Sequence, residues 1–335
     1  MKQTWTFKND LYLTATATTA GPLEADGPLF SYFDKTFGDL HCGEKTWELA
    51  ERRLMEDAVT LCLQKAGKKE SEIDLFLAGD LLNQIVTSGF FAKKNQIPFL
   101  GMFNACATSM ETLAVGSALV DAGFADTALA AVSSHNATAE RQFRYPTEYG
   151  GAKPPTAEST VTGAGAGLVS REASAVKIVE ATIGKVFDWG VTDANDMGSA
   201  MAPAAADTIA THLQDTGRSV DEYDIIATGD LSGIGSPIVK DLLLEKDIDI
   251  SGVHQDCGLM IYRPNQPVFT GGSGCACSAL VTYSYIVDEL RSGHIKRALI
   301  VATGCLHSPT MIQQKESIPT IAHAVVLERA GGAVS

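Results

Sequence analysis

The chain has 335 residues, 45% of them hydrophobic, so it is long enough to bury one large core or two smaller ones. It has no uninterrupted apolar run of about 18 residues and no apolar signal segment at its start, which predicts a protein made in the cytoplasm without a membrane span. The net charge of −14 disfavours nucleic acid and anionic lipid as partners, and seven cysteines without regular spacing predict reduced thiols.

The first predicted unit is a helix, a polar turn and an apolar strand, and the chain repeats it. Residues 55–67 (MEDAVTLCLQKAG) have a helical pattern, and the strand that follows ends in Gly-Asp-Leu at 79–81. Residues 206–217 (ADTIATHLQDTG) lead in the same way to Gly-Asp-Leu at 229–231, an offset of 150 positions. Two copies of one helix–strand unit predict a duplicated α/β fold.

Cys106 follows the next apolar run of the first half. The run at 98–105 leads into this cysteine, and a helical pattern over 109–124 follows it. A thiol at a helix N-terminus meets unpaired N–H groups and the positive end of the helix dipole, which favour the thiolate. Cysteine is also among the most often buried residue types, so a plain core position is the alternative.

The two halves differ in the length of their connections. In the first half, a strand at 127–134 is followed by a polar excursion over about 135–160, which we expect to form a lid or a dimer contact. In the second half, the matching strand at 297–304 is offset by 170 positions instead of 150, which leaves 20 extra residues. We expect them to form a surface insertion over about 245–268.

Each half closes with one more apolar strand, at 164–170 and at 323–329. The alternation of apolar strands with helices predicts mostly parallel sheets covered by helices on both sides. We therefore expect an N-terminal half over 1–175 and a C-terminal half over 176–335, layered face to face with helices between and around their sheets.

Two glycine-rich segments resemble the ketoacyl synthase III enzymes of the thiolase superfamily. TVTGAGAGLVS at 160–170 is similar to the strand that closes their N-terminal half, and GGSGCACSA at 271–279 is similar to the turn that carries their Asn or His. The resemblance implies a thiolase-like fold with Cys106 as the catalytic cysteine. It also implies a His where this chain has Asp230, and an Asn or His where it has Ser273.

A condensing enzyme needs the missing His and Asn as its oxyanion hole and proton relay. The carboxylate of Asp230 would place a negative charge where negative charge must develop during the reaction. The sequence therefore predicts a protein that holds a ligand without transforming it. An active cysteine-dependent acyltransferase of the ketoacyl synthase III type is the alternative, with His254 or His307 as an unorthodox base. A scaffold with a vestigial pocket that docks to membrane partners is the third possibility. The chain has no zinc-type or phosphate-loop motif, so we expect neither a metal held by the protein alone nor a nucleotide cofactor.

Longer segments resemble the stage V sporulation protein AD family of thiolase-like proteins from endospore-forming bacteria. The similar segments are 80–125, 133–155, 197–209 and 271–279, and the similarity runs over essentially the whole chain. It implies a non-enzymatic role, the binding of dipicolinic acid or its calcium chelate in support of uptake into the developing spore. It also implies a location at the spore inner membrane through channel proteins of the same operon, and the superfamily implies a homodimer.

A planar dicarboxylate needs N–H donors, hydroxyls and cations around it. The helix start at Cys106 and the turn with Ser273 and Gly274 are predicted to supply aligned N–H groups. Arg144 and Lys153 in the excursion are predicted to supply positive charge, together with Arg141.

Asp230 is predicted to lie beside the ligand, where a bridging Ca²⁺ would reconcile the two negative charges. His254 is included as a pocket residue, since an insertion can fold back over the site. Further candidates near the strand ends are Cys305, His307 and His135.

Overall fold

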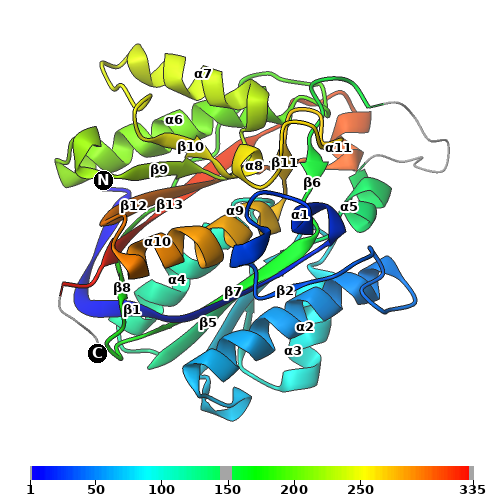
Figure 1. The fold of residues 1–335 in the computed structure, drawn as a ribbon. Helices are drawn as coiled ribbons and strands as arrows, with labels where there is room; N and C mark the ends of the chain where they lie inside the picture. Colours follow the sequence, from blue (N-terminus) through cyan, green and yellow to red (C-terminus); the bar gives the residue numbers. More distant parts are fainter. Residues whose placement is uncertain (1, 144–152, 332–335) are drawn as a thin grey trace.

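The computed structural model describes residues 2–143 and 153–331, and its main feature is one 11-stranded sheet (Figure 1). Its strands are β1 (Thr4–Ala20), β2 (Lys35–Thr36), β3 (Leu75–Asp80), β4 (Phe99–Gly101), β5 (Thr127–Ser134), β7 (Gly163–Ser170), β8 (Val176–Thr182), β9 (Ile225–Thr228), β10 (His254–Asp256), β12 (Arg297–Cys305) and β13 (Thr320–Arg329). The short strands β6 (Ser159–Thr160) and β11 (Gly272–Ser273) form a separate parallel pair.

The helices cover this sheet and fill the space between its two halves. They are α1 (Pro22–Ala25), α2 (Trp47–Ala66), α3 (Val86–Asn95), α4 (Thr108–Asp121), α5 (Asn136–Phe143), α6 (Met197–Thr216), α7 (Ser232–Leu244), α8 (Cys257–Met260), α9 (Cys275–Val281), α10 (Val287–Ser292) and α11 (Pro309–Gln313). A π-helical turn, Thr282–Ile286, joins α9 to α10.

The strand order confirms the predicted duplication. One half runs β4-β3-β5-β7-β1 and the other runs β10-β9-β12-β13-β8, so each strand has a counterpart at the same place in the other half. The outer three strands of each half are parallel, as predicted, and the closing strands β7 and β13 pair antiparallel with their neighbours. A thiolase-like α/β arrangement with helices between and around the sheet halves is therefore present.

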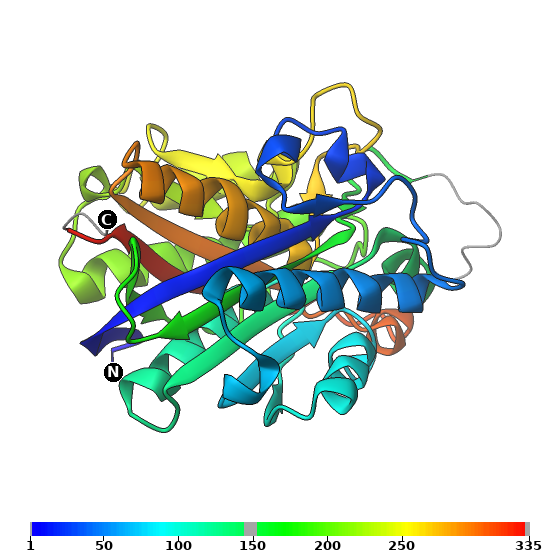
Figure 2. The ribbon, with the colours of Figure 1, turned by 60° about the horizontal axis from the view of Figure 1, so that its bottom comes forward.

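The two halves of the sheet are joined to each other. The helices α4, α9 and α10 lie between the halves, while α2 and α3 cover one outer face and α6 and α7 cover the other (Figure 1). In Figure 2, β1 (blue) runs beside β7 (green) with α2 across them. Because β1 also pairs with β8, and β8 with β13, the hydrogen-bond ladder continues from one half into the other.

The repeated residues have repeated structural roles. Gly67 and Gly217 end α2 and α6 with φ of 65° and 72°, a left-handed conformation that glycine adopts without strain. Asp74 accepts hydrogen bonds from the N–H groups of 126 and 127 at 2.9 Å each. Asp224 does the same for the N–H groups of 296 and 297 at 2.6 and 3.0 Å. Each aspartate thereby ties the start of its own strand to the start of the next one.

Helix α4 places Cys106 at the junction of the halves. Met110, Leu113 and Ala114 are fully buried, since α4 packs against β3 and β5 of one half and against β12 and β13 of the other. The turn before it takes a positive φ of 50° at Ala105, and Cys106 follows directly. The N-terminus of α4 therefore lies where both halves contribute side chains.

The predicted insertion and excursion are only partly as expected. Residues 254–256 of the insertion form β10, which pairs with β9 as β4 pairs with β3, so the extra chain of the second half follows β10 and includes α8. The interpretation of His254 as part of a surface loop was wrong, because it lies in the sheet. The excursion begins with α5 and ends with β6, and residues 144–152 lie outside the described part of the chain.

Candidate functional site

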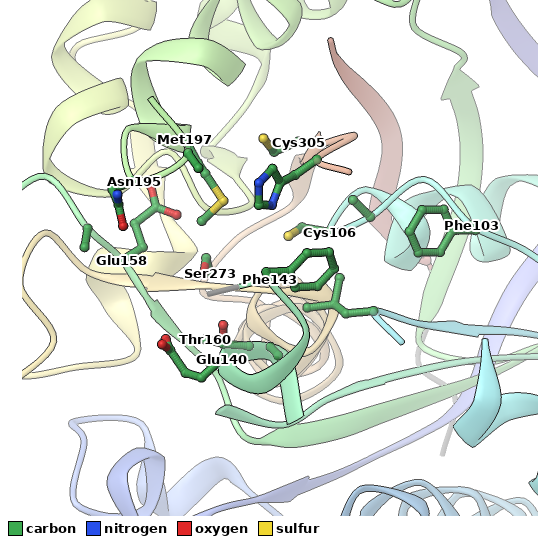
Figure 3. A pocket seen from close by; sticks show the side chains of 16 residues that line it. Phe103, Cys106, Glu140, Phe143, Glu158, Thr160, Asn195, Met197, Ser273 and Cys305 are labelled. Atoms are coloured by element: carbon green, nitrogen blue, oxygen red, sulfur yellow. The ribbon is translucent and has the colours of Figure 1, made fainter. Parts of the chain in front are cut away.

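A pocket opens at the N-terminus of α4, between the two halves (Figure 3). It encloses about 710 Å³ of space between side chains, counted out to its mouth. Its residues come from α5, β6, β11, the end of β12 and the turns before α4 and α6: Leu81, Phe103, Ala105, Cys106, Ala139, Glu140, Phe143, Ala157, Glu158, Thr160, Ala194, Asn195, Met197, Ser273, Cys305 and His307. A pocket lined mainly by apolar side chains with a few polar groups among them is typical of small-molecule sites.

Cys106 and Ser273 line the same pocket, as the sequence predicts. The thiol of Cys106, however, is held in its neutral form. Cys106 is 7% exposed, and its thiol lies close enough to the carboxyl group of Asp230 for the two groups to interact electrostatically. Burial, followed by the charge of Asp230, raises the pKa of the Cys106 thiol well above its usual value. The prediction that this helix N-terminus favours a thiolate at Cys106 is therefore wrong. Burial of the thiol and the neighbouring carboxyl group of Asp230 outweigh the effect of the helix dipole.

Asp230 was predicted to lie beside the ligand, but it is not among the residues that line the pocket, and it uses the Gly274 N–H that the sequence assigned to a ligand. Its carboxylate accepts hydrogen bonds from Thr303 Oγ1 at 2.5 Å and from the N–H of Gly274 at 3.1 Å. Burial raises the pKa of Asp230 to about 7, although these hydrogen bonds lower it. The predicted role of the Gly274 N–H as a ligand donor is corrected accordingly, since Asp230 already occupies it.

Glu158 is the main pocket residue that the sequence reasoning missed. It is 6% exposed, and neither oxygen of its carboxyl group has a hydrogen-bond partner among the described residues. Figure 3 places it between Asn195 and Ser273 on the wall of the pocket. Burial, followed by the charges of Asp230, Asp256 and Asp196, raises its pKa well above the usual value.

The predicted cations are engaged elsewhere or lie outside the described residues. Lys153 forms an ion pair with Glu140 at 2.5 Å, and its ammonium lies 6.0 Å from the ring centroid of Phe269. Arg141 forms an ion pair with Glu48 on α2. Arg144 falls in the segment 144–152, which the structure does not describe.

His254 lies away from this pocket. Its Nε2 is 2.9 Å from Thr228 Oγ1, and it lines a separate hollow with Lys240 and Leu259 beside β10. The structure does not bring it near Cys106, because β10 is the edge strand of the second half.

The other histidine and cysteine candidates are divided between the pocket and the core. Cys305 and His307 line the pocket, and the ring centroids of His307 and Phe143 are 5.3 Å apart. Burial lowers the pKa of His307, which favours its neutral form. His135 does not line the pocket: it is buried, with Nε2 2.7 Å from the carbonyl oxygen of Leu40. Within residues 2–143 and 153–331, no three His, Cys, Asp or Glu side chains are grouped so that they could hold a metal ion.

The fold and the cysteine pocket define a thiolase-like protein. A 3-oxoacyl-acyl-carrier-protein synthase III from Aquifex aeolicus VF5 is similar in structure, with a TM-score of 0.58 and 13% identity, covering 95% of this chain and 99% of that one. Human mitochondrial 3-ketoacyl-CoA thiolase in complex with CoA has a TM-score of 0.59 at 12% identity, covering 97% and 99%. At such identities the likeness concerns the fold alone.

The family follows from the sequence comparisons. The family model for stage V sporulation protein AD matches residues 1–328. The stage V sporulation protein AD of Bacillus subtilis (strain 168) is 64% identical over 332 residues, which is 99% of this chain and 98% of that protein. The chain belongs to the stage V sporulation protein AD family, a family of sporulation proteins. Among the described helices, none is both long and apolar enough to cross a membrane.

Proposed function

We propose that this protein binds dipicolinic acid without transforming it, and that it supports the uptake of this compound into the developing spore. The observation that carries the proposal is the burial of the Cys106 thiol beside Asp230. A buried thiol next to a carboxyl group is held in the neutral form, and a neutral thiol is a poor nucleophile. Membership of a family of sporulation proteins supports a role in spore formation.

The lining of the pocket suits a small planar acid. Phe103, Phe143 and Met197 provide apolar surface for a ring, and Ser273 and Asn195 provide polar groups at its edge. Since Lys153 already pairs with Glu140, a ligand carboxylate needs another donor or a bound cation. The calcium chelate of the ligand is one way to supply that charge.

Binding experiments test this proposal directly. Titration calorimetry with dipicolinate, with EDTA in one series and excess Ca²⁺ in another, should show saturable binding in at least one series. Isophthalate, which has the same spacing of carboxylates but no ring nitrogen, is the matched ligand control. Cys106→Ala should weaken binding by reshaping the pocket floor, while Cys42→Ala, a buried cysteine outside the pocket, should not. The absence of dipicolinate binding in both series would refute the proposal.

The acyltransferase alternative makes a different prediction. After incubation with acyl-CoA, intact mass spectrometry should show no acyl adduct on this protein. An adduct that disappears in Cys106→Ala would show that the thiol is reactive and would favour the enzyme.

We further propose that the protein acts as a homodimer at the spore inner membrane, held by the channel proteins of its operon. The dimer proposal is supported by β4, a sheet edge whose Leu100 is 43% exposed, beside the exposed Phe103. Sedimentation equilibrium tests it, with Leu100→Lys expected to give monomers. Co-purification from sporulating cells with and without the channel proteins tests the membrane location.

A further inference from the structure

Glu158 is a buried acid that no other described group satisfies. The residue is only 6% exposed. Both oxygens of its carboxyl group are buried and lack hydrogen-bond partners among the described residues. Leaving such a group unpaired costs about 1–3 kcal/mol or more. The carboxyl group faces the cavity that contains Cys106 and Ser273 (Figure 3). An unpaired polar group on a cavity wall is placed to contact what enters the cavity.

Glycine at 198 leaves the space for this carboxyl group. A methyl group built on Gly198, in the first turn of α6, would come within 3.2 Å of Glu158 Oε1 and 2.7 Å of the carbonyl oxygen of Leu231. The carboxyl group is therefore packed closely against the first turn of α6, and both of its oxygens are buried.

Burial and the neighbouring carboxyl groups both raise the pKa of Glu158 and favour its neutral form. Asp230 faces it from the end of β9, Asp256 from β10 and Asp196 from the turn before α6, and each of these charges disfavours a second negative charge. The other titratable groups around it are thiols or lie across the pocket: Cys106, Cys277, Cys305, His307 and Glu140. Lys153 is held at the rim by Glu140, so no lysine or arginine among the described lining residues offsets these carboxyl groups. A carboxylic acid in its neutral form has one O–H to donate.

We propose that Glu158 is a ligand-binding residue that keeps its proton and donates a hydrogen bond from that proton to a carboxylate of the bound dicarboxylate. This rests on the proposed function, and it explains how a pocket with an acidic floor accepts a dianion without a free cation. No bond other than the hydrogen bond forms, and the proton stays on Glu158 in the complex. Hydrogen bonds between an acid and a carboxylate are short and are stronger than neutral ones.

Substitutions at Glu158 distinguish a donor from a cation ligand. Glu158→Gln keeps the length of the side chain and an N–H donor but cannot ionise, whereas Glu158→Met keeps the length and removes the donor. Dipicolinate binding should be measured by calorimetry with EDTA present, between pH 6 and pH 9. We expect Glu158→Gln to bind within a few-fold of the wild type at pH 6, and Glu158→Met to bind about tenfold or more weakly.

The pH series gives a second readout. As the pH rises through the pKa of Glu158 in the ligand-free protein, the affinity of the wild type should fall by up to about tenfold per pH unit, because the ionised form cannot donate. Glu158→Gln should lose this fall. Glu111→Gln is the control, since burial raises the pKa of Glu111 to about 7 and this residue lies outside the pocket lining. It should leave the pH dependence of binding unchanged.

The stability of the ligand-free variants separates a binding role from a structural one. Glu158→Met removes an unpaired buried acid, so its thermal midpoint should equal or exceed that of the wild type, whereas a structural residue would give a lower one. Equal pH dependence of binding in the wild type and Glu158→Gln, or full affinity in Glu158→Met, would overturn the proposal. Wild-type binding that requires Ca²⁺ and disappears in Glu158→Gln would overturn it in favour of a cation held by Glu158. A wild type that binds no dipicolinate under any condition refutes the proposed function itself.

Discussion

Buried acids predict that this protein loses stability as the pH rises from 6.5 to 8.0. Burial raises the pKa of Glu24, Glu111 and Asp230 to about 7 and that of Glu51 to about 8. In the unfolded chain these groups return to ordinary values near 4, as is usual for carboxyl groups. The folded state therefore binds more protons than the unfolded state over this range, and the free energy of unfolding falls as the pH rises.

The expected loss is large compared with ordinary protein stability. Between pH 6.5 and 8.0, each group with a pKa of about 7 costs a little under about 1 kcal/mol, and the one at about 8 costs about 2 kcal/mol, so the four groups together cost about 4 kcal/mol. Three histidines act in the opposite direction: burial lowers the pKa of His212, His254 and His323 to about 4, while the unfolded forms still bind protons at pH 6.5. Together the three histidines return about 1 kcal/mol, so the net loss of stability is about 3 kcal/mol.

Urea denaturation at pH 6.5, 7.2 and 8.0 and constant ionic strength measures this loss. Glu111→Gln should reduce the drop between the two end points by about 1 kcal/mol, because it removes one titrating group. Glu70→Gln, at an exposed position, should leave the drop unchanged. A free energy of unfolding that stays constant or increases from pH 6.5 to 8.0 would refute the reasoning.

Three smaller predictions concern the floor of the pocket. Gly274→Ala should destabilise the protein by about 2 kcal/mol or more in the same urea assay. The reason is that φ at this position is 105° and a methyl group would lie 2.8 Å from Ser134 Oγ. Gly89→Ala is the control and should not destabilise the protein, because the space around Gly89 on α3 is open. Iodoacetamide at pH 7.5 should modify Cys106 at least about tenfold more slowly than a cysteine in an unfolded peptide, as followed by peptide mass mapping; an equal rate would contradict the raised pKa of the thiol. Thr303→Val removes the hydroxyl that donates to Asp230 and should cost about 1–3 kcal/mol, whereas Thr310→Val on the surface should have little effect on the urea midpoint.

The fold could be predicted from the sequence because its signals are local and occur twice. The helix–turn–strand unit ending at Gly79 and the one ending at Gly229 both form, with the same glycine caps and the same aspartate ties. The position of β10 was missed, because a three-residue edge strand has too short a pattern to stand out from a loop.

The pocket was only half predictable for a related reason. Cys106 and Ser273 were found because each lies at the start of a helix after a recognisable strand or turn. Glu158 gave no such signal, since a single acid in a polar excursion looks like a solvated loop residue until the chain folds around it. The sequence also could not show that Gly274 donates to Asp230, because that bond joins residues 44 positions apart.

The strand pairing across the two halves has a consequence for how a ligand gains entry. Two-lobed binding proteins commonly open and close about a hinge between their lobes. Here the ladder from β1 to β8 crosses the boundary, so swinging the halves apart would break backbone hydrogen bonds of the sheet. Entry and release must therefore take place at the mouth, through side chains such as Phe143 and His307, while the two halves stay fixed as one frame.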